Sequence, residues 1–174
     1  TGLRAGRNFL TSNGSTVNTF GSTISGTTIG AIASTFSTLN FTNSRVVATD
    51  DAGFGVFLVG GDAFATGSQI EGGENGVRVH YESADLNAAH LVLDNSQVAG
   101  RNGAALLVTG NSGISTVGDI QVRNGSTLTG GNGNILEVNG NSSANMNVDN
   151  SALFGDVVVE DGSTAKLQLN NGAS

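Results

Sequence analysis

Two adjacent carboxylates, Asp50 and Asp51, are the first residues of the chain whose types and spacing could support catalysis. A pair of carboxylates can cleave a glycosidic bond, and the separation of the two groups sets the stereochemical outcome. Adjacent residues of a strand point to opposite faces, so the two groups converge only if they lie in a loop. No further Asp, His or basic residues recur at matching positions of the neighbouring repeats. We therefore interpret the pair as a solvated turn.

One segment concentrates imidazole, phenol and carboxylate groups. It carries His80, Tyr81 and Asp85, and His90 follows it closely. A metal site made of His80, Asp85 and His90 would lack the tight ligand spacing that is typical of such sites. The segment fills a repeat unit of longer spacing, and loops on rigid scaffolds often carry function. We expect an exposed loop that projects from the scaffold, with these four residues as its candidate contact residues.

A third group of acids could bind calcium. Glu71 and Glu74 flank two glycines, and Asp62 could complete an oxygen site. The repeated glycine-rich nonapeptides of calcium-binding coils are missing, and neither a phosphate-binding Gly-Lys-Ser/Thr loop nor a Gly-x-Ser-x-Gly nucleophile turn is present. We therefore assign no catalytic residue, no metal and no cofactor, and we do not expect an enzyme.

The overall composition excludes several classes of protein. The 174 residues include 27 Gly, no Cys and no Pro, and only 12% are charged, with a net charge of −7. Disulfide scaffolds and thiolate metal sites are impossible without Cys. The acidic balance disfavours nucleic acid and anionic membrane surfaces as partners. No apolar run is long enough for a membrane span, so we expect no direct membrane insertion of this segment.

Short predicted strands recur along the chain, and similar turn residues follow each of them. Apolar residues alternate at 91–93, 120–122, 146–148 and 167–169, and an Asn turn follows each segment. Alternation of this kind is typical of strands. The second apolar residue of each unit gives an inexact period near 26, with spacings of 23, 29, 29, 26 and 21 residues between the anchors Phe41, Phe64, Leu93, Val122, Val148 and Leu169.

A repeat of this length has about three strands, which is too few residues and strands for a propeller blade. The repeat therefore favours a solenoid. We predict one all-β domain over residues 1–174, a right-handed parallel β-helix of about six or seven coils with three short strands per coil. Residues 39–174 hold the clearer repeats and residues 1–38 irregular N-terminal coils. Residues that tolerate left-handed backbone geometry should form a structural turn column, namely Asn43, Gly67, Asn95, Asn124, Asn150 and Asn171.

The segment Leu167-Gln168-Leu169-Asn170-Asn171-Gly172-Ala173-Ser174 resembles the repeating coil of pertactin-like autotransporter passenger domains. The units at 91–100, 120–130 and 146–155 fit the same loose pattern. The resemblance implies a Gram-negative protein that is secreted or displayed on the outer membrane through its own C-terminal β-barrel. It also implies that the chain is a fragment of a longer passenger. No Arg-Gly-Asp adhesion tripeptide is present.

We expect the segment to act in adhesion, with a host surface receptor or a like passenger (self-association) as its partner. Two alternatives stay open, a β-helical polysaccharide-degrading enzyme and a passive spacer of the passenger stalk. Ice binding would require regular Thr arrays on one face, and the Ser-Thr pairs of this sequence do not form them throughout.

Overall fold

The segments in which apolar and polar residues alternate form β-strands, and these strands stack in parallel. The computed structural model describes residues 1–6, 13–81, 88–111 and 113–174. These residues form strands, turns and bends without any helix, and the strands make three parallel sheets. Among the described residues, no helix is long and apolar enough to cross a membrane.

Sheets A and B have seven strands each, whereas sheet C has five in the described residues. Sheet A contains β1 (Leu3–Ala5), β4 (Ile29–Ser34), β7 (Phe54–Val59), β10 (Asn75–His80), β13 (Leu106–Thr109), β16 (Asn134–Asn139) and β18 (Asp156–Val159). Sheet B contains β2 (Thr16–Phe20), β5 (Thr38–Thr42), β8 (Asp62–Thr66), β11 (Ala89–Asp94), β14 (Val117–Arg123), β17 (Ser143–Asp149) and β19 (Thr164–Asn170). Sheet C contains β3 (Thr23–Gly26), β6 (Arg45–Ala48), β9 (Gln69–Gly72), β12 (Gln97–Gly100) and β15 (Thr127–Gly130). Sheet C is smaller because the coil that holds β17 and β18 adds no strand to it.

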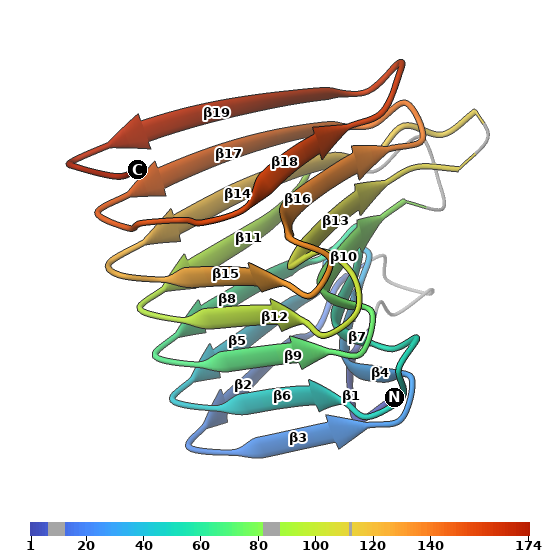
Figure 1. Cartoon of the computed structure of the whole chain (residues 1–174). Helices are drawn as coiled ribbons and strands as arrows, with labels where there is room; N and C mark the ends of the chain where they lie inside the picture. Colours follow the sequence, from blue (N-terminus) through green and yellow to red (C-terminus); the bar gives the residue numbers. More distant parts are fainter. Residues whose placement is uncertain (7–12, 82–87, 112) are drawn as a thin grey trace.

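The chain runs repeatedly from sheet B to sheet C and then to sheet A. In Figure 1 it passes along sheet C at the front, returns along sheet B behind, and climbs from the blue N-terminal end to the red C-terminal end. This path is a right-handed coil of about six turns with three strands per turn. The predicted all-β parallel β-helix is thereby confirmed.

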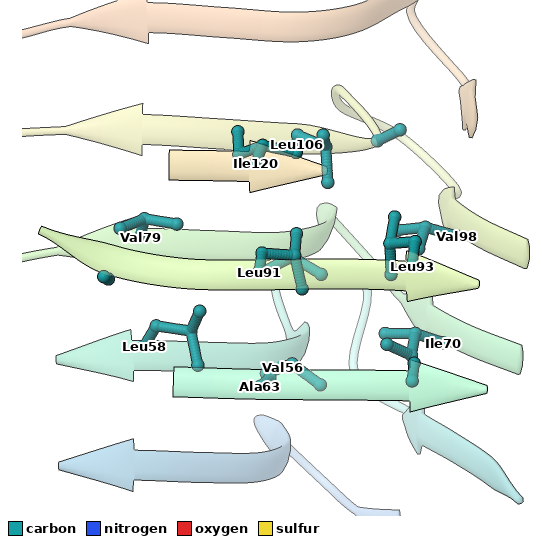
Figure 2. Packing of buried hydrophobic residues seen from close by; sticks show 14 of the residues in the cluster. Val56, Leu58, Ala63, Ile70, Val79, Leu91, Leu93, Val98, Leu106 and Ile120 are labelled. Atoms are coloured by element: carbon teal, nitrogen blue, oxygen red, sulfur yellow. The ribbon is translucent and has the colours of Figure 1, made fainter. Parts of the chain in front are cut away.

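The core consists of side chains that stack in columns between coils. Leu91 of β11 is flanked in register by Ala63 below and Ile120 above, and all three are at most 2% exposed. Figure 2 shows these side chains pointing into the narrow space between the sheets. Burial of a Val, Leu or Ile side chain contributes about 1.5–3 kcal/mol relative to its exposure, so small aliphatic residues suffice for this core.

One anchor of the predicted period is wrong. Ala65, rather than Phe64, lies in register with Phe41 and Leu93. Phe64 faces outward and is 38% exposed, whereas Ala65 is buried. A shift by one residue moves a strand side chain to the opposite face, so the spacings around this coil are 24 and 28 residues.

Left-handed turns separate sheet B from sheet C. The six residues of the turn column all have positive φ angles, from 45° at Asn150 to 58° at Gly67. Asn and Gly adopt this geometry with little strain. Each of them directly follows the last residue of a sheet B strand, so Asn or Gly starts the same corner in successive coils.

Buried hydroxyl groups connect the coils at two corners. After the Asn or Gly turn, the backbone N–H of Ser44 donates to the Oγ of Ser68 at 3.0 Å, and the corner serines of later coils repeat the contact. At the corner between sheets A and B, the N–H of Thr116 donates to the Oγ of Ser142, whose own N–H donates to the Oγ of Ser163. These contacts satisfy backbone groups that lie outside the strand ladders.

Candidate functional site

A groove of about 590 Å³ follows the corner at which sheet C strands turn into sheet A. Its walls come from four consecutive coils, and they are rich in carboxylate and amide groups. The lining residues are Asp51, Ala52, Glu74, Asn75, Asn102, Gly103, Leu107, Asn132, Glu137 and Asn139.

Backbone hydrogen bonds stack the turns that form the groove. The N–H of Glu74 donates to the carbonyl of Gly53, and the N–H of Gly103 donates to the carbonyl of Glu74, both at 2.9 Å. A Cβ on Gly73 would lie only 1.8 Å from the carbonyl oxygen of Asp50, so the close stacking requires glycine at this position. Each coil therefore presents its polar turn residues directly above those of the coil below.

The strands of sheet A bring residues three apart to the same outer face. Ile135 and Leu136 are both buried, and the β16–β18 pairing shifts in register at this point. Two consecutive inward residues leave Asn134 and Glu137 on the outside, where Asn134 Nδ2 donates to Glu137 Oε1 at 2.7 Å. Asn132 Nδ2 donates to the same oxygen at 2.7 Å. The Glu137 carboxylate is thereby held in a fixed orientation in the groove.

Asn75 is the buried polar residue of the groove. It is 2% exposed, and its Nδ2 donates to the carbonyl of Ala104 at 3.2 Å. Its Oδ1 is buried without a hydrogen-bond partner. A buried acceptor left unsatisfied costs about 1–3 kcal/mol. A ligand that donates a hydrogen bond to Asn75 Oδ1 would remove this cost.

Arg78 lies three residues beyond Asn75 on the outer face of sheet A. Its guanidinium carbon lies 4.8 Å from the ring centroid of Phe54 and 5.4 Å from that of Phe57. Its Nε is buried without a partner. Burial lowers the pKa of Arg78, and the nearby Glu74 carboxylate opposes this shift. The cation therefore packs on the aromatic rings beside the groove.

Arg101 fastens the turn at one end of the groove. Its guanidinium donates to the carbonyl oxygens of residues 48, 49 and 50 at 3.2–3.4 Å and to Glu71 Oε1 at 2.9 Å. It also lies 3.7 Å from Asp51 Oδ1. A planar guanidinium with five donors suits this fan of acceptors, so Arg101 keeps the loop before β7 in place.

The two adjacent carboxylates have separate positions. Asp50 Oδ1 accepts a hydrogen bond from the N–H of Ala52 at 2.9 Å and so closes its own turn. The Asp51 side chain is 91% exposed and lines the groove. Both residues lie in the turn between β6 and β7, in agreement with the turn predicted for them from the sequence.

The three acids considered for calcium lie on different parts of the coil. Glu71 is on β9 of sheet C and pairs with Arg45 and Arg101 at 2.9 Å each. Glu74 is in the groove, and Asp62 is on β8 of sheet B. Within the described ranges, no three His, Cys, Asp or Glu residues are arranged to hold a metal ion.

Two residues of the expected contact loop are buried, and that part of the expectation is wrong. His80 ends β10 and is 6% exposed, with Nδ1 3.0 Å from the carbonyl of Thr109 and Nε2 3.2 Å from the Nδ2 of Asn111. A carbonyl can only accept and an amide N–H donates, so these partners fit the neutral imidazole with its proton on Nδ1.

Tyr81 is 2% exposed, and its hydroxyl donates to the carbonyl of Val117 at 2.8 Å. His80 and Tyr81 are buried because their backbone and side chains contact the next coil. Asp85 lies outside the described residues.

His90 is exposed, but it lies on sheet B rather than beside His80. Its Nδ1 is 3.1 Å from Asp62 Oδ1 and its Nε2 is 3.8 Å from Asp119 Oδ2. Asp119 also accepts from Asn145 Nδ2 at 2.8 Å. These side chains form a polar column on the outer face of successive coils, and exposed pairs of this kind contribute about 0–1 kcal/mol each.

The outer columns of sheet C are chemically mixed. Thr127 lies in register with Gln97, which lies in register with Gln69. The regular Thr array that ice binding would require is therefore absent from the described strands of this sheet.

Several groove residues are not predicted from the sequence, among them Asn75, Asn102, Asn132 and Glu137. The signal that marks them is a recurring turn after the sheet C strand, with Gly72-Gly73-Glu74, Gly100-Arg101-Asn102 and Gly130-Gly131-Asn132 in successive coils. No protein-family model, curated protein or solved structure matches the chain.

Proposed function

We propose that this chain is a segment of a secreted or surface-displayed β-helical passenger whose role is adhesion. The observation that carries the proposal is the groove, in which four stacked coils present carboxylates and amides on a continuous scaffold. Polar side chains held on rigid elements at the surface are typical of binding surfaces. The contacts would be polar and repeated from coil to coil.

The placement of the imidazoles supports contact rather than catalysis. General acid–base chemistry needs a titratable group within reach of the bound substrate. Both ring nitrogens of His80 are hydrogen-bonded to Thr109 and Asn111, and His90 projects from sheet B beside Asp62 and Asp119. Neither imidazole lines the groove.

The resemblance to pertactin-like passengers supports the surface setting. Under this proposal, the segment is displayed by a Gram-negative cell, and a host surface receptor or a second passenger is its partner. The stacked sheets suit such a setting because each coil contacts only its neighbours, so a stalk of this kind extends without a larger core.

The proposal is tested with beads that carry the purified chain. Binding of the beads to epithelial monolayers, and clumping of the beads with one another, are counted for the unmodified chain and for the double variant Glu74→Ala/Asn102→Ala. Both residues are exposed in the groove. Because Asn102 Nδ2 also donates to the carbonyl of Asp51 at 3.2 Å, circular dichroism establishes that the double variant is folded. The exposed Glu160, which is outside the groove, gives the control variant Glu160→Ala.

We expect the unmodified chain and the control to adhere or clump, and the double variant to lose most of this binding. Equal binding by all three chains would place the contact elsewhere on the rod. An absence of both adhesion and clumping would contradict the proposed function.

A further inference from the structure

We infer that the groove at the corner of sheets C and A binds a neutral oligosaccharide. The inference rests on the proposed adhesive function, and it names the class of ligand that the groove recognises. It is argued from the charge, the length and the unpartnered amide of the groove.

The charge of the groove disfavours anionic ligands. Three carboxylates line it, from Asp51, Glu74 and Glu137, and none of its described lining residues is Lys or Arg. The Arg101 guanidinium lies near Asp51, but it is occupied by Glu71 and backbone oxygens. A second cation, Arg78, packs on Phe54 and Phe57 beside the groove. Phosphorylated and carboxylated ligands would therefore meet three carboxylates in the groove and these two cations at its edges. The net charge of −7 acts in the same direction.

The hydrogen-bonding groups of the groove fit a polyhydroxyl ligand. Ionised carboxylates accept through two oxygens, and Asn side chains both donate and accept. Adjacent hydroxyl groups of a sugar offer the matching arrangement of donors and acceptors. Glu137 is already oriented by Asn132 and Asn134, so it is pre-organised for such a contact.

The length of the groove fits a short chain of sugars. Four coils spaced about 4.8 Å apart span about 14 Å along the rod, which is room for about three linked sugar rings. Leu107 lies among the polar groups and offers an apolar contact for the C–H face of a ring. The groove also lies on the outer surface of the coil, so a longer glycan can pass through it.

Asn75 supplies the buried acceptor. Its Oδ1 has no partner, although the residue lines the groove. A Cβ built on Gly103 would lie 2.8 Å from Asn75 Nδ2 and 3.3 Å from Glu74 Cγ, so these two side chains are close together. Asn75 is 2% exposed and Glu74 beside it is exposed, so a sugar hydroxyl bound at Glu74 would lie next to the Asn75 amide. That hydroxyl would provide the missing hydrogen bond.

The test is a titration of the soluble chain with defined trisaccharides, followed by calorimetry or NMR. The neutral probes are maltotriose, cellotriose, mannotriose and chitotriose, and the anionic probe is trigalacturonate. We expect at least one neutral probe to bind with a dissociation constant of about 0.1–1 mM, and trigalacturonate to bind at least about tenfold more weakly.

Variants locate the binding to the groove. Glu74→Ala/Asn102→Ala should weaken binding of the neutral probe by about tenfold or more, and Glu160→Ala should leave it unchanged. Asn75→Leu tests the buried acceptor, with circular dichroism to establish that the variant is folded. The inference is overturned if no neutral probe binds at about 10 mM, if trigalacturonate binds best, or if the double variant binds as well as the unmodified chain.

The bead assay separates this inference from the proposed function. If the beads adhere and no neutral trisaccharide binds in the groove, the inference fails while adhesion stands. If a trisaccharide binds in the groove but the beads neither adhere nor clump, the ligand class stands and adhesion fails. Release of new reducing ends from the bound probe would overturn both in favour of a polysaccharide-degrading enzyme.

Discussion

The Oγ of Ser96 accepts a hydrogen bond of 3.1 Å from the backbone N–H of Ser68, which lies one coil below. Ser96 Oγ also donates to the carbonyl of Asp94 at 2.9 Å. The same pair of bonds recurs at Ser68, which accepts from the N–H of Ser44 and donates to the carbonyl of Thr66. A row of buried serines thus joins successive coils at the corner between sheets B and C.

Replacing Ser96 with Ala should lower the free energy of unfolding by about 1–3 kcal/mol, because the buried N–H of Ser68 would lose its acceptor. Urea denaturation monitored by circular dichroism measures the change. Ser25→Ala is the matched control, since Ser25 is exposed on β3 and its change should stay within about 0.5 kcal/mol. Equal effects of the two substitutions would show that the serine row does not stabilise the coil stack.

The left-handed turn at Asn95 gives a second prediction. Its φ angle is 46°, and a β-branched residue is strained in this region. Asn95→Val should therefore destabilise the chain by about 1–3 kcal/mol, whereas Asn95→Gly should change its stability by no more than about 1 kcal/mol. Thermal unfolding of the two variants side by side provides the measurement. A Val variant as stable as the Gly variant would contradict the backbone role of this column.

The coil architecture could be predicted because its backbone geometry restricts the residue types. Positive φ angles at one corner favour Asn or Gly, as at Asn43 and Gly67, and inward positions on strands favour aliphatic residues, as at Leu91 and Leu93. The sequence does not predict the serine row, although Asn-Ser or Gly-Ser follows the strand at 43–44, 67–68, 95–96 and 150–151. A serine in a turn has many ordinary explanations, and only the stacking of coils shows that its hydroxyl faces the chain below.

The one-residue error in the period has a direct energetic test. Phe41 is 1% exposed in the core, and Phe64 is 38% exposed on the outer face of β8. Phe41→Ala should lower the free energy of unfolding by about 3–5 kcal/mol because it leaves a cavity, whereas Phe64→Ala should lower it by about 1 kcal/mol or less. Chemical denaturation of the two variants distinguishes the registers. A larger decrease in the free energy of unfolding for Phe64→Ala than for Phe41→Ala would indicate that Phe64 is the residue that faces the core.

The groove could not be predicted because its residues are far apart in the sequence. Asp51, Glu74, Asn102 and Asn132 come together only when the coils stack at this corner. Coil lengths differ, so the sequence alone does not set which turn residues share a column. The burial of His80 has a similar cause, since Asn111 of the next coil and the ring of Phe57 in the preceding one cover it. Polar residues in a long unit suggest a loop until such neighbours are known.

The single tyrosine provides a test of burial at high pH. Burial raises the pKa of Tyr81, the charges of Asp119 and Asp62 raise it further, and a backbone hydrogen bond at Ala89 opposes them. In the unfolded chain the phenol titrates near pH 10, so the unfolded chain loses this proton first as the pH rises. The stabilisation is therefore fully present below about pH 10 and is lost as the pH rises towards the folded pKa.

We expect the free energy of unfolding to fall with pH above about pH 10, and tyrosinate absorbance to develop together with the loss of circular dichroism. The chain has one Tyr and no Trp, so the absorbance change reports this residue alone. Tyr81→Phe is the matched variant. It loses the hydrogen bond to the carbonyl of Val117, at a cost of about 1 kcal/mol near neutral pH, but its stability should depend less on pH in the alkaline range. Tyrosinate that forms near pH 10 while the circular dichroism stays native would show that the phenol of Tyr81 is accessible to solvent.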